Sequence, residues 1–239
     1  MPDRFYAPGK WQTGDELDLP EGESQHISRV LRMKPGQSVE LFNGLGNHAL
    51  AELVEVGKRR VSVRICGGVV SQDVPEVHVT LAVASPKGDR FRWMLEKLTE
   101  LGVDRLIPLR TERGVVDPRD SKLEKLEQNV IAACKQCRRD RLMEIAPVQS
   151  LAEVLAQSPR GCLFGDAIGE PLSQVLASSD AASPMVIVVG PEGGLTDAER
   201  DLLQAAGAFP VCVGRHVLRI ETAAVALAAA ALSMLPAGR

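Results

Sequence analysis

The chain has 239 residues, of which 45% are hydrophobic and 25% are charged, a composition typical of a folded globular protein and unlike that of a disordered or collagen-like chain. Its length is sufficient for two domains. The most apolar run, residues 223–235, is shorter than the ~20 residues that a membrane-spanning helix needs. The first residues lack the basic and apolar segments of a signal peptide. We therefore expect a cytoplasmic protein with no membrane segment.

The net charge is −3, but it is unevenly distributed along the chain. Residues 87–141 carry 14 basic and 10 acidic side chains, whereas residues 142–212 carry 2 basic and 9 acidic ones. Arginine outnumbers lysine 20 to 8, and the planar guanidinium group suits phosphates and bases. These counts are equally compatible with ordinary surface charge, so they do not by themselves indicate a nucleic-acid partner.

The five cysteines are scattered, which indicates free thiols in a reducing compartment. Cys134 and Cys137 have the C-x-x-C spacing of a redox or zinc half-site. A zinc site needs a second pair, which neither Cys162 nor Cys212 has, and the motif lies inside a helical pattern. We therefore expect no metal and interpret these residues as thiols on the side of a helix.

Taken in chain order, the first 70 residues have the pattern of short strands and tight turns. Apolar and polar residues alternate with period two over 38–42, 49–56 and 60–65. The dipeptide Asn43-Gly44 is typical of a hairpin turn. The sequence therefore predicts a small β-barrel domain over residues 1–70.

A short helix interrupts these strands. Ser24 is a candidate cap for it, and Ile27, Val30 and Leu31 would share one face. The glycine- and proline-containing stretch that follows the last strand is typical of a linker, which we place at residues 71–76.

From residue 77 onward, strand and helix patterns alternate. In the first helix Phe91, Met94, Leu95, Leu98 and Leu101 recur at helical spacing, and Gly102 would end it. Three later helices begin with a capping-box spacing, at Ser121 with Glu124, Ser150 with Glu153, and Thr196 with Glu199. The predicted strands are 77–83, 105–109, 162–164, 185–189 and 211–213, and the last helix is 221–235. This alternation predicts an α/β domain over 77–239, with a parallel sheet covered on both faces.

Two glycine-containing turns concentrate the candidate chemistry. The first, residues 190–194, joins an apolar strand to a capped helix, and its glycines allow close approach of the backbone to a ligand. It matches neither a phosphate-binding P-loop nor a dinucleotide fingerprint. The second, residues 212–224, places Arg215, His216, Arg219 and Glu221 in an otherwise apolar segment. A binding pocket is favoured over helix capping and surface pairing, although His216 alone is better interpreted as a structural hydrogen-bonding residue.

Residues 190–199 (GPEGGLTDAE) and 213–223 (VGRHVLRIETA) resemble the C-terminal signature of the RsmE-type 16S ribosomal RNA (uridine-N3) methyltransferases of the SPOUT superfamily. The resemblance extends upstream to residues 97–108, to Gln136-Cys-Arg138 and to the stretch from His26 to Gly36. Gly114, where the family usually has serine, and Val217, where it has isoleucine, depart from the pattern.

The resemblance implies a SPOUT-type trefoil-knotted α/β domain preceded by a small PUA-like β-barrel that carries RNA. It also implies a homodimer and S-adenosylmethionine as cofactor, held by three adjacent loops. On this resemblance the cofactor-binding residues are Phe164, Gly165, Gly190, Pro191, Glu192, Gly193, Gly194, Val213, Gly214, Val217, Leu218, Thr222 and Ala223.

The same resemblance assigns the chemistry as transfer of a methyl group to N3 of a uridine in 16S ribosomal RNA or the small ribosomal subunit. The N3 proton must leave, and negative charge then spreads onto O2 and O4 of the base. Arg219 or Arg138 would stabilise that charge, and Glu192 or Glu221 would orient the base or accept the proton. For Glu221, a purely structural role at the start of a helix is equally plausible.

A basic cluster in the first domain, Arg29, Arg32 and Lys34, is the predicted contact to RNA, together with Arg138. Two other functions stay open. One is ribose 2′-O methylation, which would use the same cofactor loops. The other is an RNA-binding module without catalysis, which the two intact glycine turns disfavour.

Overall fold

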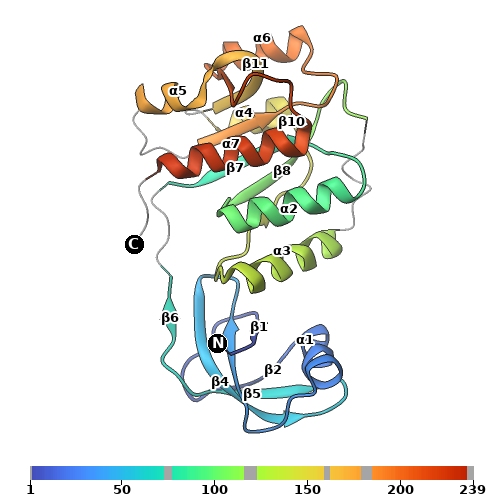
Figure 1. Ribbon diagram of the computed structural model, residues 1–239, viewed down its shortest axis with the longest axis vertical. Coiled ribbons are helices and arrows are strands. Elements are labelled where there is room, and N and C mark those ends of the chain that lie inside the picture. The colour runs from blue at the N-terminus through green and yellow to red at the C-terminus, as the bar shows by residue number, and fades with distance from the viewer. Residues whose placement is uncertain (1, 73–76, 116–122, 159–161, 179–184, 236–239) are drawn as a thin grey trace. The chain divides into compact units, whose positions relative to one another are not determined.

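The computed structural model describes residues 2–72, 77–115, 123–158, 162–178 and 185–235 (Figure 1). The chain divides into two units. The first comprises Met1–Val74 and Cys134–Leu142, and the second comprises Pro75–Ala133 and Met143–Arg239. The sequence did not indicate that a segment from the middle of the chain would belong to the first unit.

The first unit is built on a six-stranded sheet whose alternating residues bury one face. Its strands are β1 (Arg4–Tyr6), β2 (Glu16–Asp18), β3 (Ser38–Phe42), β4 (Asn47–Val56), β5 (Val61–Ile65) and β6 (Val70–Ser71). They follow the order β1-β3-β4-β5-β2, with β6 paired to β4. In β5 the alternate residues Val61, Val63 and Ile65 are buried, as the period-two pattern predicted. Strand β6 occupies the start of the predicted linker, and residues 73–76 lie outside the described part of the chain.

The helix predicted after Ser24 begins before that residue and continues as a π-helix. Helix α1 (Glu21–Gln25) contains Ser24, whose hydroxyl donates to the Leu19 carbonyl instead of capping, and a π-helix at His26–Leu31 continues it. Ile27 is buried, but Val30 is 69% exposed, so the predicted shared face is wrong. The reason is the longer hydrogen-bond spacing of a π-helix, which rotates Val30 away from the face that Ile27 occupies.

The second unit contains the predicted parallel sheet. Its strands are β7 (Val79–Ala84), β8 (Arg105–Arg110), β9 (Glu144–Ile145), β10 (Gln149–Ser150), β11 (Cys162–Pro171), β12 (Met185–Val189) and β13 (Phe209–Cys212). They run in the order β10-β8-β7-β12-β11-β13, with β9 beside β8, and every pairing in this sheet is parallel. All five residues of β12 are buried. Because successive side chains of a strand point to opposite faces, both faces of the sheet are covered there.

The helices of this sequence region are α2 (Asp89–Leu101), α3 (Leu123–Cys137), α4 (Leu151–Gln157), α5 (Leu172–Ser178), α6 (Asp197–Ala205) and α7 (Ile220–Met234). Helices α2 and α7 pack on each other, and α7 lies against β7 and β12 (Figure 1). The capping boxes predicted at Ser150 and Thr196 are confirmed, whereas Ser121 lies outside the described residues. Gly102 ends α2, but Leu101 is partly exposed instead of buried with the other apolar residues of that helix.

All five cysteines are free, as expected. Burial raises the pKa of Cys134 to about 12 and that of Cys162 to about 11, so both thiols are protonated at neutral pH. No helix in the described residues is long and apolar enough to cross a membrane. The same part of the chain contains no group of three or more side chains placed to hold a metal ion.

Candidate functional site

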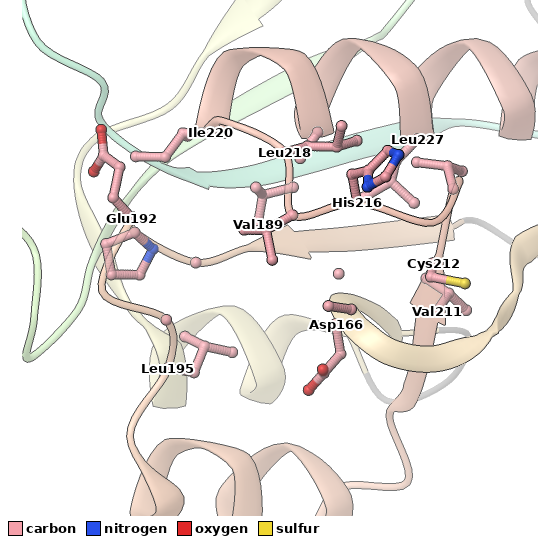
Figure 2. A pocket seen from close by; sticks show the side chains of 18 of the residues that line it. Asp166, Val189, Glu192, Leu195, Val211, Cys212, His216, Leu218, Ile220 and Leu227 are labelled. Atoms are coloured by element: carbon pink, nitrogen blue, oxygen red, sulfur yellow. The ribbon is translucent and has the colours of Figure 1, made fainter.

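A cavity of about 360 Å³ lies in the second unit, beside β11 and beyond the carboxyl ends of β12 and β13 (Figure 2). Parallel α/β sheets bind ligands at this edge, and the volume is within the range of small-molecule sites. The two glycine turns of the sequence, which are about twenty residues apart, meet here. The lining residues that the sequence singled out are Gly165, Gly190, Pro191, Glu192, Gly193, Gly194, Val213, Gly214, His216, Val217, Leu218 and Ala223.

The first turn needs glycine for two different reasons. A Cβ atom at Gly190 would lie 2.9 Å from Cγ of Leu195, so the turn is closely packed at that point. Gly194 has a φ of +71°, a backbone conformation that residues with a side chain rarely adopt. Helix α6 then begins with the capping box of Thr196 and Glu199, which fixes the direction in which the chain leaves the cavity.

The second turn supplies an apolar wall. Gly214 has a φ of +101°, which reverses the chain directly after β13. Val217 is 85% exposed although it lines the cavity, so the apolar surface of this wall is open to solvent. Leu218 and Ile220 continue the wall towards α7, as Figure 2 shows. Exposed apolar surface beside a cavity is typical of a ligand-binding site.

An ion pair that the sequence did not predict lies in the same cavity. The guanidinium group of Arg200, on α6, donates to a carboxylate oxygen of Asp166, on β11. The Asp166 side chain is largely buried, and Figure 2 shows its carboxylate directed away from Leu218, which lies on the opposite side of the cavity. The signal in the sequence was the interruption of the β11 pattern after Phe164, where a charged residue follows an apolar strand.

Two of the four predicted catalytic residues, Glu192 and Glu221, approach the same guanidinium group, that of Arg90. Glu192 lines the cavity and is the one of the four that does so. Arg219 is exposed as the N-cap residue of α7, and Glu221 is buried outside the cavity lining. Arg138 belongs to the first unit, where its Nη1 lies 3.2 Å from both carboxylate oxygens of Glu40. Two residues predicted to bind the cofactor also lie off the cavity: Phe164 is buried in the core, and Thr222 is exposed.

The basic cluster of the first unit is exposed. Arg29 lies in the π-helix, Arg32 ends it with a φ of +53°, and Lys34 follows. None of these three side chains forms an ion pair with another described residue. Their charges are therefore available to an anionic partner.

Arg90 is a residue near the cavity that sequence reasoning missed. It is the second residue of α2, and its Nη1 lies 3.9 Å from Oε1 of Glu192 and 3.8 Å from Oε1 of Glu221. A second arginine, Arg113, donates from Nη1 to the carbonyl oxygen of Gly193 at 3.0 Å. The available signal was their position, because each follows a parallel strand at the edge where ligands bind.

The family comparisons agree with this architecture. The RNA methyltransferase domain family matches residues 73–232, and the RNA methyltransferase PUA domain family matches residues 19–66. The chain therefore belongs to the RNA methyltransferase domain family.

Individual relatives identify the family within this class. The ribosomal RNA small subunit methyltransferase E of Synechocystis is 33% identical, over 89% of this chain and 71% of its own length, and that of Bacillus subtilis is 31% identical, over 91% and 87%. The structure of the Neisseria gonorrhoeae enzyme of that name, bound to S-adenosyl methionine, has a TM-score of 0.86 at 30% identity and covers 98% of both chains. A Legionella pneumophila methyltransferase solved with the same cofactor has a TM-score of 0.85 at 31% identity, again over 98% of both chains. The chain belongs to the ribosomal RNA small subunit methyltransferase E family, which confirms the resemblance seen in its motifs.

Proposed function

We propose that this protein transfers a methyl group from S-adenosylmethionine to N3 of a uridine in the 16S ribosomal RNA of the small subunit. The observation that carries the proposal is the cavity made by the two glycine turns, in a chain whose relatives of the same fold are solved with that cofactor. The family to which the chain belongs acts on small-subunit ribosomal RNA by name.

The residues around the cavity fit the cofactor. A Cβ atom at Gly165 would lie 3.2 Å from Cδ1 of Leu227, so the absence of a side chain keeps this part of the cavity open. Glycine backbone at residues 190–194 allows close approach, and the apolar wall formed by Val217 and Leu218 suits the cofactor's carbon-rich surface. When bound, S-adenosylmethionine supplies a methyl group attached to a positively charged sulfur. The residues that would hold it are Gly165, Gly190, Pro191, Glu192, Gly193, Gly194, Val213, Gly214, Val217, Leu218 and Ala223.

The location of Glu192 supports it as the group that receives the N3 proton. Glu192 lines the cavity and its side chain is 46% exposed, so a base at this end of the cavity and then water can reach the carboxylate. Glu221 is buried beside Arg90, and this position makes Glu221 better suited to a supporting role. Arg219 precedes Ile220, which lines the cavity, and is our candidate donor to the uracil oxygen on which charge develops. Arg138, in the first unit, is better suited to contact RNA elsewhere.

The architecture also supports three finer proposals. The family resemblance favours a trefoil knot in the C-terminal segment that follows β13, the strand that pairs with β11 at Leu163–Gly165 and again at Glu170–Pro171. The PUA family match supports a PUA-like barrel that presents Arg29, Arg32 and Lys34 to RNA. The resemblance further favours a homodimer that works in the cytoplasm.

Mass mapping of methylated nucleosides tests the proposed function. Small-subunit RNA from cells with and without this protein should differ by one methyl group on the base of a uridine. A methyl group on a ribose instead would favour the 2′-O alternative. Calorimetry with S-adenosylmethionine separates the non-catalytic alternative, because an RNA-binding module that has lost catalysis would not bind the cofactor.

A further inference from the structure

The donors of Arg90 are uncommitted although the residue lies beside the cavity. Its Nη1 is 3.8 and 3.9 Å from the two carboxylates, which is beyond hydrogen-bond distance, and no hydrogen bond of its side chain is found in the described residues. The other two cations that contact this turn or cavity, Arg113 and Arg200, each donate to a protein oxygen. Arg90 is therefore free to donate to an arriving ligand.

The two carboxylates beside Arg90 differ in exposure. The Glu221 side chain is 8% exposed, and its Oε2 is buried with no hydrogen-bond partner in the described part of the chain. A buried carboxylate is costly unless a cation compensates it, and Arg90 is the nearby cation. Glu221 thus holds the guanidinium group in place from the protein side. Glu192 lines one end of the cavity, and in Figure 2 its carboxylate points outward, away from Asp166 and His216.

Arg90 and Glu192 together offer a donor and an acceptor at one end of the cavity. The Watson–Crick edge of uracil presents O2 and O4 as acceptors on either side of the N3–H donor. We propose that Arg90 and Glu192 recognise this edge: Glu192 accepts a hydrogen bond from N3–H, and Arg90 donates to O4. This inference rests on the proposed function, and it adds the groups that select the base.

The same pair rejects cytosine. In cytosine N3 carries no hydrogen and is an acceptor, so it would face the carboxylate of Glu192. The amino group at C4 is a donor and would face the guanidinium group of Arg90. Two acceptors would then face each other at Glu192, and two donors at Arg90. Mismatched polar groups in a protected site lower the binding affinity. A pair of hydrogen bonds to the base edge discriminates between bases by roughly 5- to 150-fold.

RNA binding without cofactor tests the inference. The probes are two fluorescent RNA hairpins that carry the methylated position found by mass mapping, one with uridine and one with cytidine there. The wild-type protein should prefer the uridine hairpin by roughly 5- to 150-fold, and Arg90→Gln should reduce the preference to about threefold or less. Arg92→Gln is the matched control, because Arg92 is exposed on the same helix, and it should keep the wild-type preference.

Stability is controlled separately, because Arg90→Gln leaves the buried Glu221 without its counter-ion. The double variant Arg90→Gln/Glu221→Gln removes both charges and should melt close to the wild type while still failing to discriminate. Affinity for S-adenosylmethionine should stay within about threefold in both, since neither residue lines the cavity.

The outcomes are distinct. If wild-type protein prefers uridine and the folded double variant keeps that preference, the inference is wrong and the proposed function stands. If the wild-type protein binds both hairpins equally, the inference is likewise wrong, whereas methylation of the uridine found by mass mapping still supports the proposed function.

Discussion

Replacing Gly194 by valine tests whether the first glycine turn holds the cofactor. A Cβ atom at this position would meet no atom within 4 Å, so there is space for the start of the new side chain. Its effect comes from the φ of +71°, because a residue with a side chain in this conformation is strained by about 1–3 kcal/mol. A β-branched residue lies at the upper end of that range.

The strain becomes a loss of affinity. In the free protein the substituted turn relaxes to a less strained shape, and cofactor binding must restore the original one. A strain of about 1–3 kcal/mol therefore weakens binding roughly 5- to 150-fold. Isothermal titration calorimetry with S-adenosylmethionine measures this change directly.

Gly207 provides a matched control. Its φ is +76°, a Cβ atom there would also meet nothing within 4 Å, and it lies at the end of α6, outside the cavity lining. Gly207→Val should therefore introduce a similar strain of about 1–3 kcal/mol. It should lower the melting temperature by about 2–4 °C for each kcal/mol and leave cofactor affinity unchanged. A folded Gly194→Val protein that binds the cofactor with wild-type affinity would refute the assignment of this turn.

Three further predictions concern other residues. Arg32→Ala should weaken RNA binding and lower the slope of its salt dependence by roughly one unit; unchanged affinity and slope in a salt titration would remove the patch from the RNA contact. Arg219→Ala should lower the single-turnover rate ~10²–10³-fold at saturating cofactor and leave the melting curve unchanged. A rate within about threefold of the wild-type rate would exclude Arg219 as a catalytic residue. Cys134, whose pKa burial raises to about 12, should resist iodoacetamide at pH 8 while the exposed Cys66 reacts, as peptide mass spectrometry can check. Because the unfolded thiol ionises near its ordinary value of 9.0, this raised pKa lowers stability as the pH rises from about 9 towards 12.

Local patterns in the sequence were sufficient for most of the secondary structure. Residues 185–189 form a buried strand, because a short, wholly apolar run that ends in a glycine turn is typical of a strand covered on both faces of a parallel sheet. The helices at Ser150 and Thr196 begin where their capping boxes predicted, because the cap satisfies backbone groups within four residues of itself. The two glycine turns were recognisable for the same reason, since a turn's backbone requirements are contained in its own few residues.

The placement of residues that are distant in sequence was decided by the tertiary structure. Residues 134–142 belong to the first unit through ion pairs of Lys135 with Glu23 and of Arg138 with Glu40. Asp140 adds a buried pair with Arg4 and a hydrogen bond to His48. No local pattern encodes these contacts, because each partner is 90 or more positions away in the chain.

The composition of the site was likewise decided by packing. Arg219 and Glu221 are two residues apart, yet one is exposed and the other is buried, because Arg219 precedes α7 with an extended backbone whereas Glu221 lies in the first turn of the helix. Arg90 meets Glu192 only because β7 and β12 are neighbours in the sheet, although about a hundred residues separate them in the sequence. The sequence by itself determined where the chain could turn, begin a helix or form a strand. Which charges meet at the cavity depended on the order of the strands, which arises from the burial of both faces of the sheet at once.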